Sequence, residues 1–192
     1  AGTVSIPSGM MLAAALIAAS VAVSLWLPLL FQFVLLGYAF LTTAYTAALK
    51  RMLLIDVLAL AGLYTIRVIA GAAATQIDVS FWLLAFSVFF FLSLALVKRF
   101  VELDATSETG TQKVSGRGYR VSDSKVLAEA GIAATFSSVL VLALYIDSPE
   151  VQATYERPYL IWLLCPIVLY LSLRIWVLAR RGEMHEDPVV FI

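Results

Sequence analysis

The chain has 192 residues, of which 62% are hydrophobic and 14% are charged, and its formal net charge is zero. Soluble domains are about half apolar and one quarter charged, so this composition excludes an ordinary soluble domain. A balanced charge also gives no reason to expect nucleic acid as a partner, and we predict a polytopic membrane protein of the all-α class.

Six apolar runs are long enough to cross a bilayer, which takes about 20 residues in a helix. Pro28 separates the first two runs, because proline removes a helix hydrogen bond and clashes with the preceding turn. Runs of this length without strict alternation indicate helices rather than barrel strands. The expected spans are Ser8–Leu27, Pro28–Leu49, Met52–Thr75, Phe81–Val97, Val126–Ile146 and Tyr159–Ala179.

Basic residues gather at one end of these predicted helices. With six spans, the turn at Lys50 and Arg51, the polar loop 98–123 and the C-terminal tail fall on one side of the membrane. The shorter polar loop 147–157, on the other side, contains a single arginine, Arg157. The positive-inside rule therefore predicts that the long loop faces the cytoplasm.

The same end collects polar side chains that could carry chemistry. Carboxylates beside basic side chains suit a magnesium-bridged phosphate or diphosphate, because Mg²⁺ prefers oxygen ligands and arginine can bind phosphate with two parallel hydrogen bonds. The candidates are Tyr45, Lys50, Arg51, Asp56, Lys98, Arg99, Glu102, Asp104, Arg117, Tyr119 and Asp123.

A purely structural explanation accounts for part of this set. Basic residues commonly end membrane helices, and Lys98 and Glu102 would form an i, i+4 pair on a continuing helix. Asp56 could lie at the membrane surface and pair with Lys50 or Arg51. The residues alone leave the functional and the structural explanations open.

Asp56 and Arg67 lie within the third span, where ionisable side chains are costly and mark functional sites. They are eleven residues apart, near one helix face, with Tyr64 between them. The rise of about 16 Å between them prevents a direct pair. Each needs a partner on another helix or a watery cavity, so we predict that all three residues line a cavity. Phenylalanines 89–91 are expected to face lipid or other helices, although they could also line a prenyl chain.

The chain resembles the UbiA-type prenyltransferase superfamily, in particular the branch near members fused to haloacid-dehalogenase-like domains and near polyprenyl-phosphate phosphoribosyltransferases. The similar stretches are YTAALKR (45–51), LYTIRVIAGAAA (63–74), FFFLSLALVKRFVEL (89–103), GRGYRVSD (116–123) and RGEMHEDPVVF (181–191). The resemblance implies one UbiA-like transmembrane domain over residues 1–192, about two-thirds of a roughly nine-helix bundle around a cavity. It also implies that the domain is truncated at both ends, with a first aspartate-rich motif upstream of Ala1 and a fused or adjacent soluble domain.

The activity implied by this resemblance is Mg²⁺-dependent transfer of a prenyl group from a prenyl diphosphate to a lipid-soluble acceptor in the membrane. The residues implied as catalytic are Lys50, Arg99, Glu102 and Asp104. The implied diphosphate-binding residues are Tyr45, Lys50, Arg51, Lys98, Arg99, Arg117 and Tyr119, and the implied metal ligands are Glu102, Asp104 and Asp123. Without the upstream motif, we expect the isolated fragment to be inactive.

Two alternatives remain. The usual second aspartate triad is replaced here by Lys98, Arg99, Glu102 and Asp104, and this VKRFVEL form suggests a phosphoribosyl diphosphate donor with a polyprenyl-phosphate acceptor. A non-enzymatic transporter or structural subunit is the other alternative. Transporters place paired ionisable groups near the membrane midplane, whereas most charges here crowd one face, which counts against transport.

Overall fold

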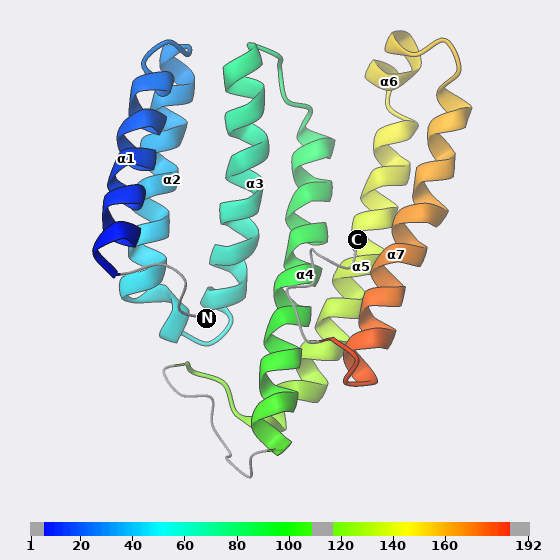
Figure 1. Ribbon diagram of the computed structural model, residues 1–192. Helices are drawn as coiled ribbons and strands as arrows, with labels where there is room; N and C mark the ends of the chain where they lie inside the picture. Colours follow the sequence, from blue (N-terminus) through cyan, green and yellow to red (C-terminus); the bar gives the residue numbers. More distant parts are fainter. Residues whose placement is uncertain (1–5, 109–116, 185–192) are drawn as a thin grey trace.

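The computed structural model describes residues 6–108 and 117–184, which contain helices and no strand (Figure 1). Six helical segments within these ranges are long and apolar enough to cross a membrane. They are α1 (Ile6–Ser24), α2 (Leu29–Ala47), α3 (Ile55–Thr75), α4 (Phe81–Glu108), α5 (Ser124–Ile146) and α7 (Leu164–Arg180), which continues from the 3₁₀ segment η3 (Pro158–Leu163). The predicted all-α polytopic bundle is confirmed.

Several helix ends differ from the sequence prediction, and two differences change the predicted loops. Helix α4 was expected to end at Val97 but continues to Glu108, because the polar residues that follow are compatible with a helix once it leaves the apolar layer. The predicted loop 147–157 contains the short helix α6 (Pro149–Thr154). It begins where Ser148 accepts a hydrogen bond from the Val151 N–H and proline follows the cap, as at many helix starts.

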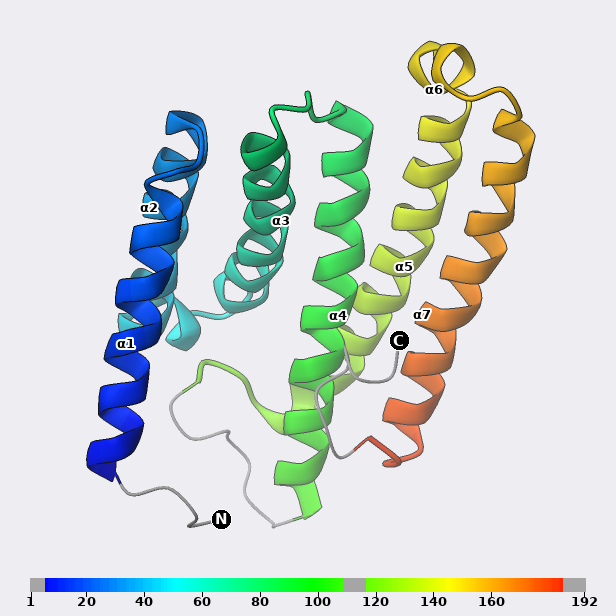
Figure 2. The same cartoon turned by 45° about the horizontal axis from the view of Figure 1, so that its top comes forward.

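The helices lie side by side in chain order, with α3 between α2 and α4 in both ribbon views (Figures 1 and 2). The core lies where α4 and α5 pack together with α3 and α7, around Val97, Leu103, Ala128 and Ile175. By contrast, α2 contains no buried residue, and Ser24 is the one buried residue among the described side chains of α1.

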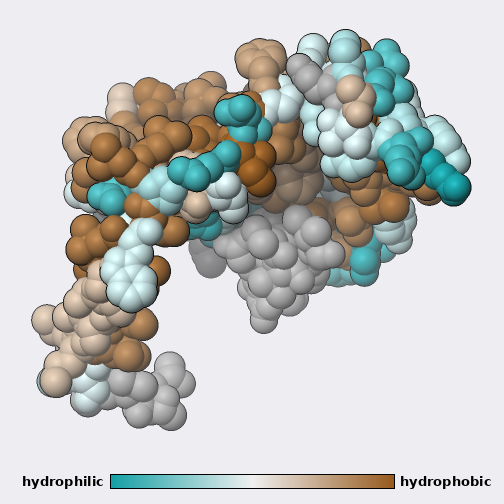
Figure 3. All heavy atoms as spheres, turned by 90° about the horizontal axis from the view of Figure 1, so that it is seen from above, coloured by the Kyte–Doolittle hydropathy of each residue, from teal (hydrophilic) through white to brown (hydrophobic). Residues whose placement is uncertain are grey.

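Polar and apolar surfaces divide as expected for a membrane protein. Seen from above, hydrophilic residues gather over the region of α6 while the helix flanks are largely hydrophobic (Figure 3). At the lower end in Figure 1, the α2–α3 turn lies beside the described segment that leads into α5, and α7 ends at the same end of the molecule. Chain topology thus brings to one end the polar segments that sequence analysis singled out.

Candidate functional site

Asp56 is the centre of the polar cluster at this lower end. It is the second residue of α3 and is fully buried, and the partial positive charge of the helix N-terminus favours a carboxylate there. The Tyr45 hydroxyl at the end of α2 donates to Asp56 Oδ1 at 2.8 Å. From α4, Arg99 donates through Nε to Oδ2 and through Nη2 to Oδ1, the latter at 3.2 Å. The pair is bidentate, which fixes both planar groups.

Arg99 joins three helices through a single buried guanidinium, since only 2% of it is exposed. Besides Asp56, it donates to the Tyr45 hydroxyl at 3.0 Å and to Glu102 Oε2, one turn later on α4. Its donors are directed at protein acceptors, so Arg99 sets the relative positions of α2, α3 and α4.

Arg117 completes the cluster from the segment that precedes α5. Its Nη1 donates to both Asp56 oxygens at 3.4 Å, and its Nε lies 3.1 Å from Glu102 Oε2. These contacts to Asp56 are longer than those of Arg99, and the Arg117 side chain is 22% exposed. We call Tyr45, Asp56, Arg99, Glu102 and Arg117 the arginine–carboxylate cluster. Arg117 is its more accessible cation, and Glu102, at 32% exposed, is its more accessible carboxylate.

Tyr119 holds the segment that carries Arg117. Its side chain is 1% exposed and its hydroxyl accepts a hydrogen bond from the Leu54 N–H at 3.1 Å. Leu54 has φ 62°, an unusual conformation for a branched residue. Burial raises the pKa of the Tyr119 phenol. The Tyr119 hydroxyl thus contacts the α2–α3 turn, and its predicted role in binding diphosphate stays a prediction.

Gly118 allows this segment to approach that turn. A Cβ at Gly118 would lie 2.9 Å from the Arg51 carbonyl oxygen and 3.1 Å from the Leu53 nitrogen. Such distances leave no room for any other residue without a backbone shift. The glycine and Tyr119 thus place Arg117 over Asp56.

The other predicted residues of this end lie outside the cluster. Lys50 and Arg51 form part of the 3₁₀ turn η1 (Leu49–Arg51), and Asp104 lies half-buried on α4. Half-buried Lys98 directly precedes Arg99 on that helix. The Asp123 carboxylate accepts from the Arg120 N–H at 2.9 Å and closes the turn η2 (Val121–Asp123). His185, which the sequence left without a role, is outside the described residues.

The described carboxylates do not form a magnesium site by themselves. The predicted ligands Glu102, Asp104 and Asp123 are not brought together, and no group of three Asp, Glu, His or Cys side chains within residues 6–108 and 117–184 could hold a metal ion. Glu102 faces two arginines and Asp123 faces a backbone N–H. Mg²⁺ therefore stays a prediction from the family resemblance.

The structural explanation for Asp56, a pair with Lys50 or Arg51, named the wrong partners. Asp56 pairs with Arg99 and Arg117, not with Lys50 or Arg51, because the start of α3 faces α4 instead of the adjoining turn. Asp56 and Arg67 were each expected to have a partner on another helix or a watery cavity, and each has a partner on another helix. Arg67 Nη2 donates to the Tyr38 hydroxyl of α2 at 2.8 Å. Sequence analysis missed Tyr38, whose signal was a phenol in the middle of an apolar helix.

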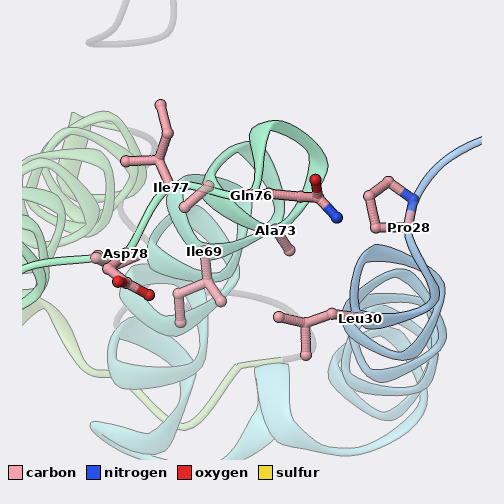
Figure 4. A pocket seen from close by; sticks show the side chains of 9 residues that line it. Pro28, Leu30, Ile69, Ala73, Gln76, Ile77 and Asp78 are labelled. Carbon is pink, nitrogen blue, oxygen red and sulfur yellow. The ribbon is translucent and has the colours of Figure 1, made fainter.

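A pocket of about 400 Å³ lies at the opposite end of the molecule, between the start of α2 and the end of α3 (Figure 4). Pro28, Leu30 and Ile69 form much of its wall, with Gln76 and Asp78 at the α3–α4 turn. It contains no basic side chain, so it lacks the charge for a phosphate.

Comparison with known sequences finds one family model and several relatives that match this chain. The UbiA prenyltransferase family matches residues 1–191. An uncharacterized protein, y4nM of Sinorhizobium fredii, is 35% identical over 100% of this chain and 37% of its own length. Nodulation protein NoeC of Azorhizobium caulinodans is 32% identical over 81% of this chain and 50% of its own length. A decaprenyl-phosphate phosphoribosyltransferase of Mycolicibacterium smegmatis is 34% identical over 53% of this chain and 32% of its own length. The chain spans half or less of the length of these relatives.

Proposed function

Because the chain belongs to the UbiA prenyltransferase family, we propose that it forms the diphosphate-binding part of an integral membrane transferase. In this proposal, the arginine–carboxylate cluster binds the diphosphate of a donor, and the group that the donor releases passes to a lipid-soluble acceptor within the membrane. The cytoplasmic orientation of the cluster, which rests on the positive-inside rule, belongs to the proposal.

The observation that carries this proposal is the difference between the two arginines. Arg99 is buried and held by Asp56, whereas Arg117 is partly exposed and more distant from the same carboxylate. A phosphate oxygen could replace the long contacts of Arg117 while Arg99 and Asp56 preserve the framework. Cations aimed at a leaving diphosphate stabilise the charge that develops on it. Arg117 is therefore the proposed diphosphate ligand, and Arg99 is the proposed positioning residue.

We favour phosphoribosyl diphosphate as the donor and a polyprenyl phosphate as the acceptor. Among these relatives, those named for a reaction are decaprenyl-phosphate phosphoribosyltransferases. The cluster is consistent with a polar donor, because Tyr45 and Glu102 offer hydrogen-bonding groups that ribose hydroxyls could use. In this reaction the phosphate of the acceptor replaces diphosphate at the ribosyl carbon.

Prenyl diphosphate is the second candidate donor, favoured by the family match. Tyr64 of α3 and Phe91 of α4 stack with ring centroids 5.2 Å apart, and both lie farther into the membrane than the cluster. Aromatic faces of this kind attract a carbocation and could flank a prenyl chain. Mg²⁺ would neutralise the diphosphate of either donor when bound. Residues other than the described carboxylates must supply much of its coordination.

The deciding experiment uses the full-length protein in membranes with Mg²⁺ and two radiolabelled donors, phosphoribosyl diphosphate and a prenyl diphosphate, offered separately. We expect label to enter lipid from phosphoribosyl diphosphate, and Arg117→Gln to slow transfer by about 100-fold, the typical effect of removing one charge-stabilising donor. Arg180→Gln, at the exposed end of α7, is the matched control and should transfer normally.

Each other outcome has a distinct meaning. Label that enters lipid only from prenyl diphosphate would show that prenyl diphosphate, not phosphoribosyl diphosphate, is the donor. Equal transfer by Arg117→Gln and the wild type would remove the cluster from the reaction. No transfer from either donor by the folded protein would favour a non-enzymatic membrane role.

A further inference from the structure

A second polar site lies deeper in the membrane, on the face of α3 that carries Asp56. Arg67 follows Asp56 by eleven residues, close to three helical turns, and the two side chains therefore share one face. The Arg67 guanidinium lies 4.9 Å from the Tyr64 ring centroid and 5.5 Å from that of Tyr38. Tyr38 is the middle residue of α2, about 14 Å from either helix end at 1.5 Å per residue.

No carboxylate within residues 6–108 and 117–184 balances the charge of Arg67. Among the described residues it takes part in no salt bridge, and its recorded hydrogen bond goes to the neutral Tyr38 hydroxyl. A guanidinium has five N–H donors, and the Arg67 side chain is exposed, so further donors can reach a ligand. An ionised group at this depth is costly unless a partner or a cavity compensates it.

The surroundings of Arg67 define the rest of the ligand. Arg67 and Tyr38 line a pocket of about 300 Å³ between α2 and α3, together with apolar Phe31, Leu35 and Ile66 and the small residues Ala70 and Gly71. A bilayer head group resting at the membrane surface would remain about 14 Å away along the helix axis. A ligand of Arg67 must therefore insert between the helices, with an anionic group attached to an apolar chain or ring.

From this combination we propose that Arg67 and Tyr38 form a binding site for an amphiphile that carries one oxyanion, a carboxylate or a phosphate. The oxyanion accepts hydrogen bonds from the Arg67 guanidinium, with Tyr38 holding the guanidinium in place. The apolar body lies against Phe31, Leu35 and Ile66. This site is separate from the arginine–carboxylate cluster, about 16 Å farther along α3, and the proposal goes beyond the proposed donor site because it holds an anion at a different depth in the membrane.

Binding to the full-length protein in neutral-lipid nanodiscs tests this assignment. The probes are oleate and farnesyl phosphate, which supply the two oxyanions, and their uncharged counterparts oleyl alcohol and farnesol. We expect at least one anion to bind about tenfold or more tightly than its neutral counterpart. Arg67→Met retains length and removes the charge, and should abolish that preference, while Tyr38→Phe should weaken it. Whichever anion shows the larger preference identifies the head group that the site accepts.

Arg174→Met is the matched control, because Arg174 is another exposed arginine inside a membrane-crossing helix. It should retain the preference for the anion. A preference that survives Arg67→Met in a protein with normal thermal stability would overturn the proposal, as would equal binding of both anions and their neutral counterparts. These binding measurements do not depend on transfer activity, so a protein that binds anions but transfers no label would disprove only the proposed function.

Discussion

At the scale of single residues, the cluster depends on the carboxylate of Asp56, because water cannot reach the buried arginine beside it to take its place. Asp56 is fully buried and receives hydrogen bonds from Tyr45 and from two arginines. Arg99 is buried beside it and has lost its hydration in turn. Removing one member of such a pair leaves the other charge buried and poorly compensated.

We therefore predict that Asp56→Asn destabilises the protein by about 3 kcal/mol, the lower range for breaking a buried pair. Thermal unfolding of the purified protein in detergent measures this loss. Asp104→Asn is the control, since Asp104 is a half-buried carboxylate on α4 outside the cluster, and its unfolding should stay close to that of the wild type. Equal stability of the two variants would contradict the central role of Asp56.

At the scale of elements, the segment before α5 is attached to the α2–α3 turn by backbone proximity. Gly118 approaches the Arg51 carbonyl, and Tyr119 accepts a hydrogen bond from Leu54. These contacts join two connections that are far apart in the sequence, and Arg117 depends on both for its position over Asp56.

Gly118→Ala should displace this segment, because its methyl group would lie within about 3 Å of backbone atoms that cannot rotate away. We expect faster hydrogen exchange at the Leu54 amide and a KM for the diphosphate donor raised by about tenfold, with a smaller effect on thermal stability. Gly62→Ala is the control, since nothing lies within 4 Å of a Cβ there. Unchanged exchange at Leu54 would show that the glycine is not required for this contact.

The packing of α5 against α7, like the contact at Gly118, leaves no room for an added methyl group. A Cβ at Gly131 would overlap the Trp176 ring, whose Cζ2 would lie 1.9 Å away. Trp176 also donates to Ser93 on α4 at 3.0 Å, and Ser93 shares a hydrogen bond with Thr135 on α5. The indole is therefore fixed by partners on two neighbouring helices.

Gly131→Ala should cost about 1–3 kcal/mol, as overpacked cores do, measured by thermal unfolding against the same Gly62→Ala control. The double variant Gly131→Ala, Trp176→Phe should recover part of this loss, because a smaller ring makes room for the methyl group. A single variant as stable as the wild type would mean that α7 can shift away without cost.

At the scale of the whole molecule, six spans place the cluster and the α3–α4 turn on opposite membrane faces (Figure 1). In a background with Cys165→Ala, we predict that Asp78→Cys in the α3–α4 turn reacts with a membrane-impermeant maleimide in intact cells. Ser122→Cys, at the end of the molecule that holds the arginine–carboxylate cluster, should react only after the cells are permeabilised. Both positions are exposed in the structure, so the reverse pattern would invert the proposed orientation.

The sequence by itself determined the architecture and the residues from which the cluster is drawn. Apolar runs separated by Pro28 and by charged turns specify six helices, because a bilayer requires long, internally hydrogen-bonded segments. The sequence also placed Asp56, Arg99, Glu102 and Arg117 at one end, since an even number of crossings returns the chain to the same side.

Only the tertiary structure decided which of these residues meet. The bidentate contact of Arg99 with Asp56 joins residues 43 positions apart, and the helix rotations that allow it arise from side-chain packing in the core. The same packing excludes Asp104 and Asp123 from the cluster and places Tyr38 against Arg67. The length of each apolar run sets the length of the span, but the partner of a buried charge depends on how neighbouring helices turn toward one another.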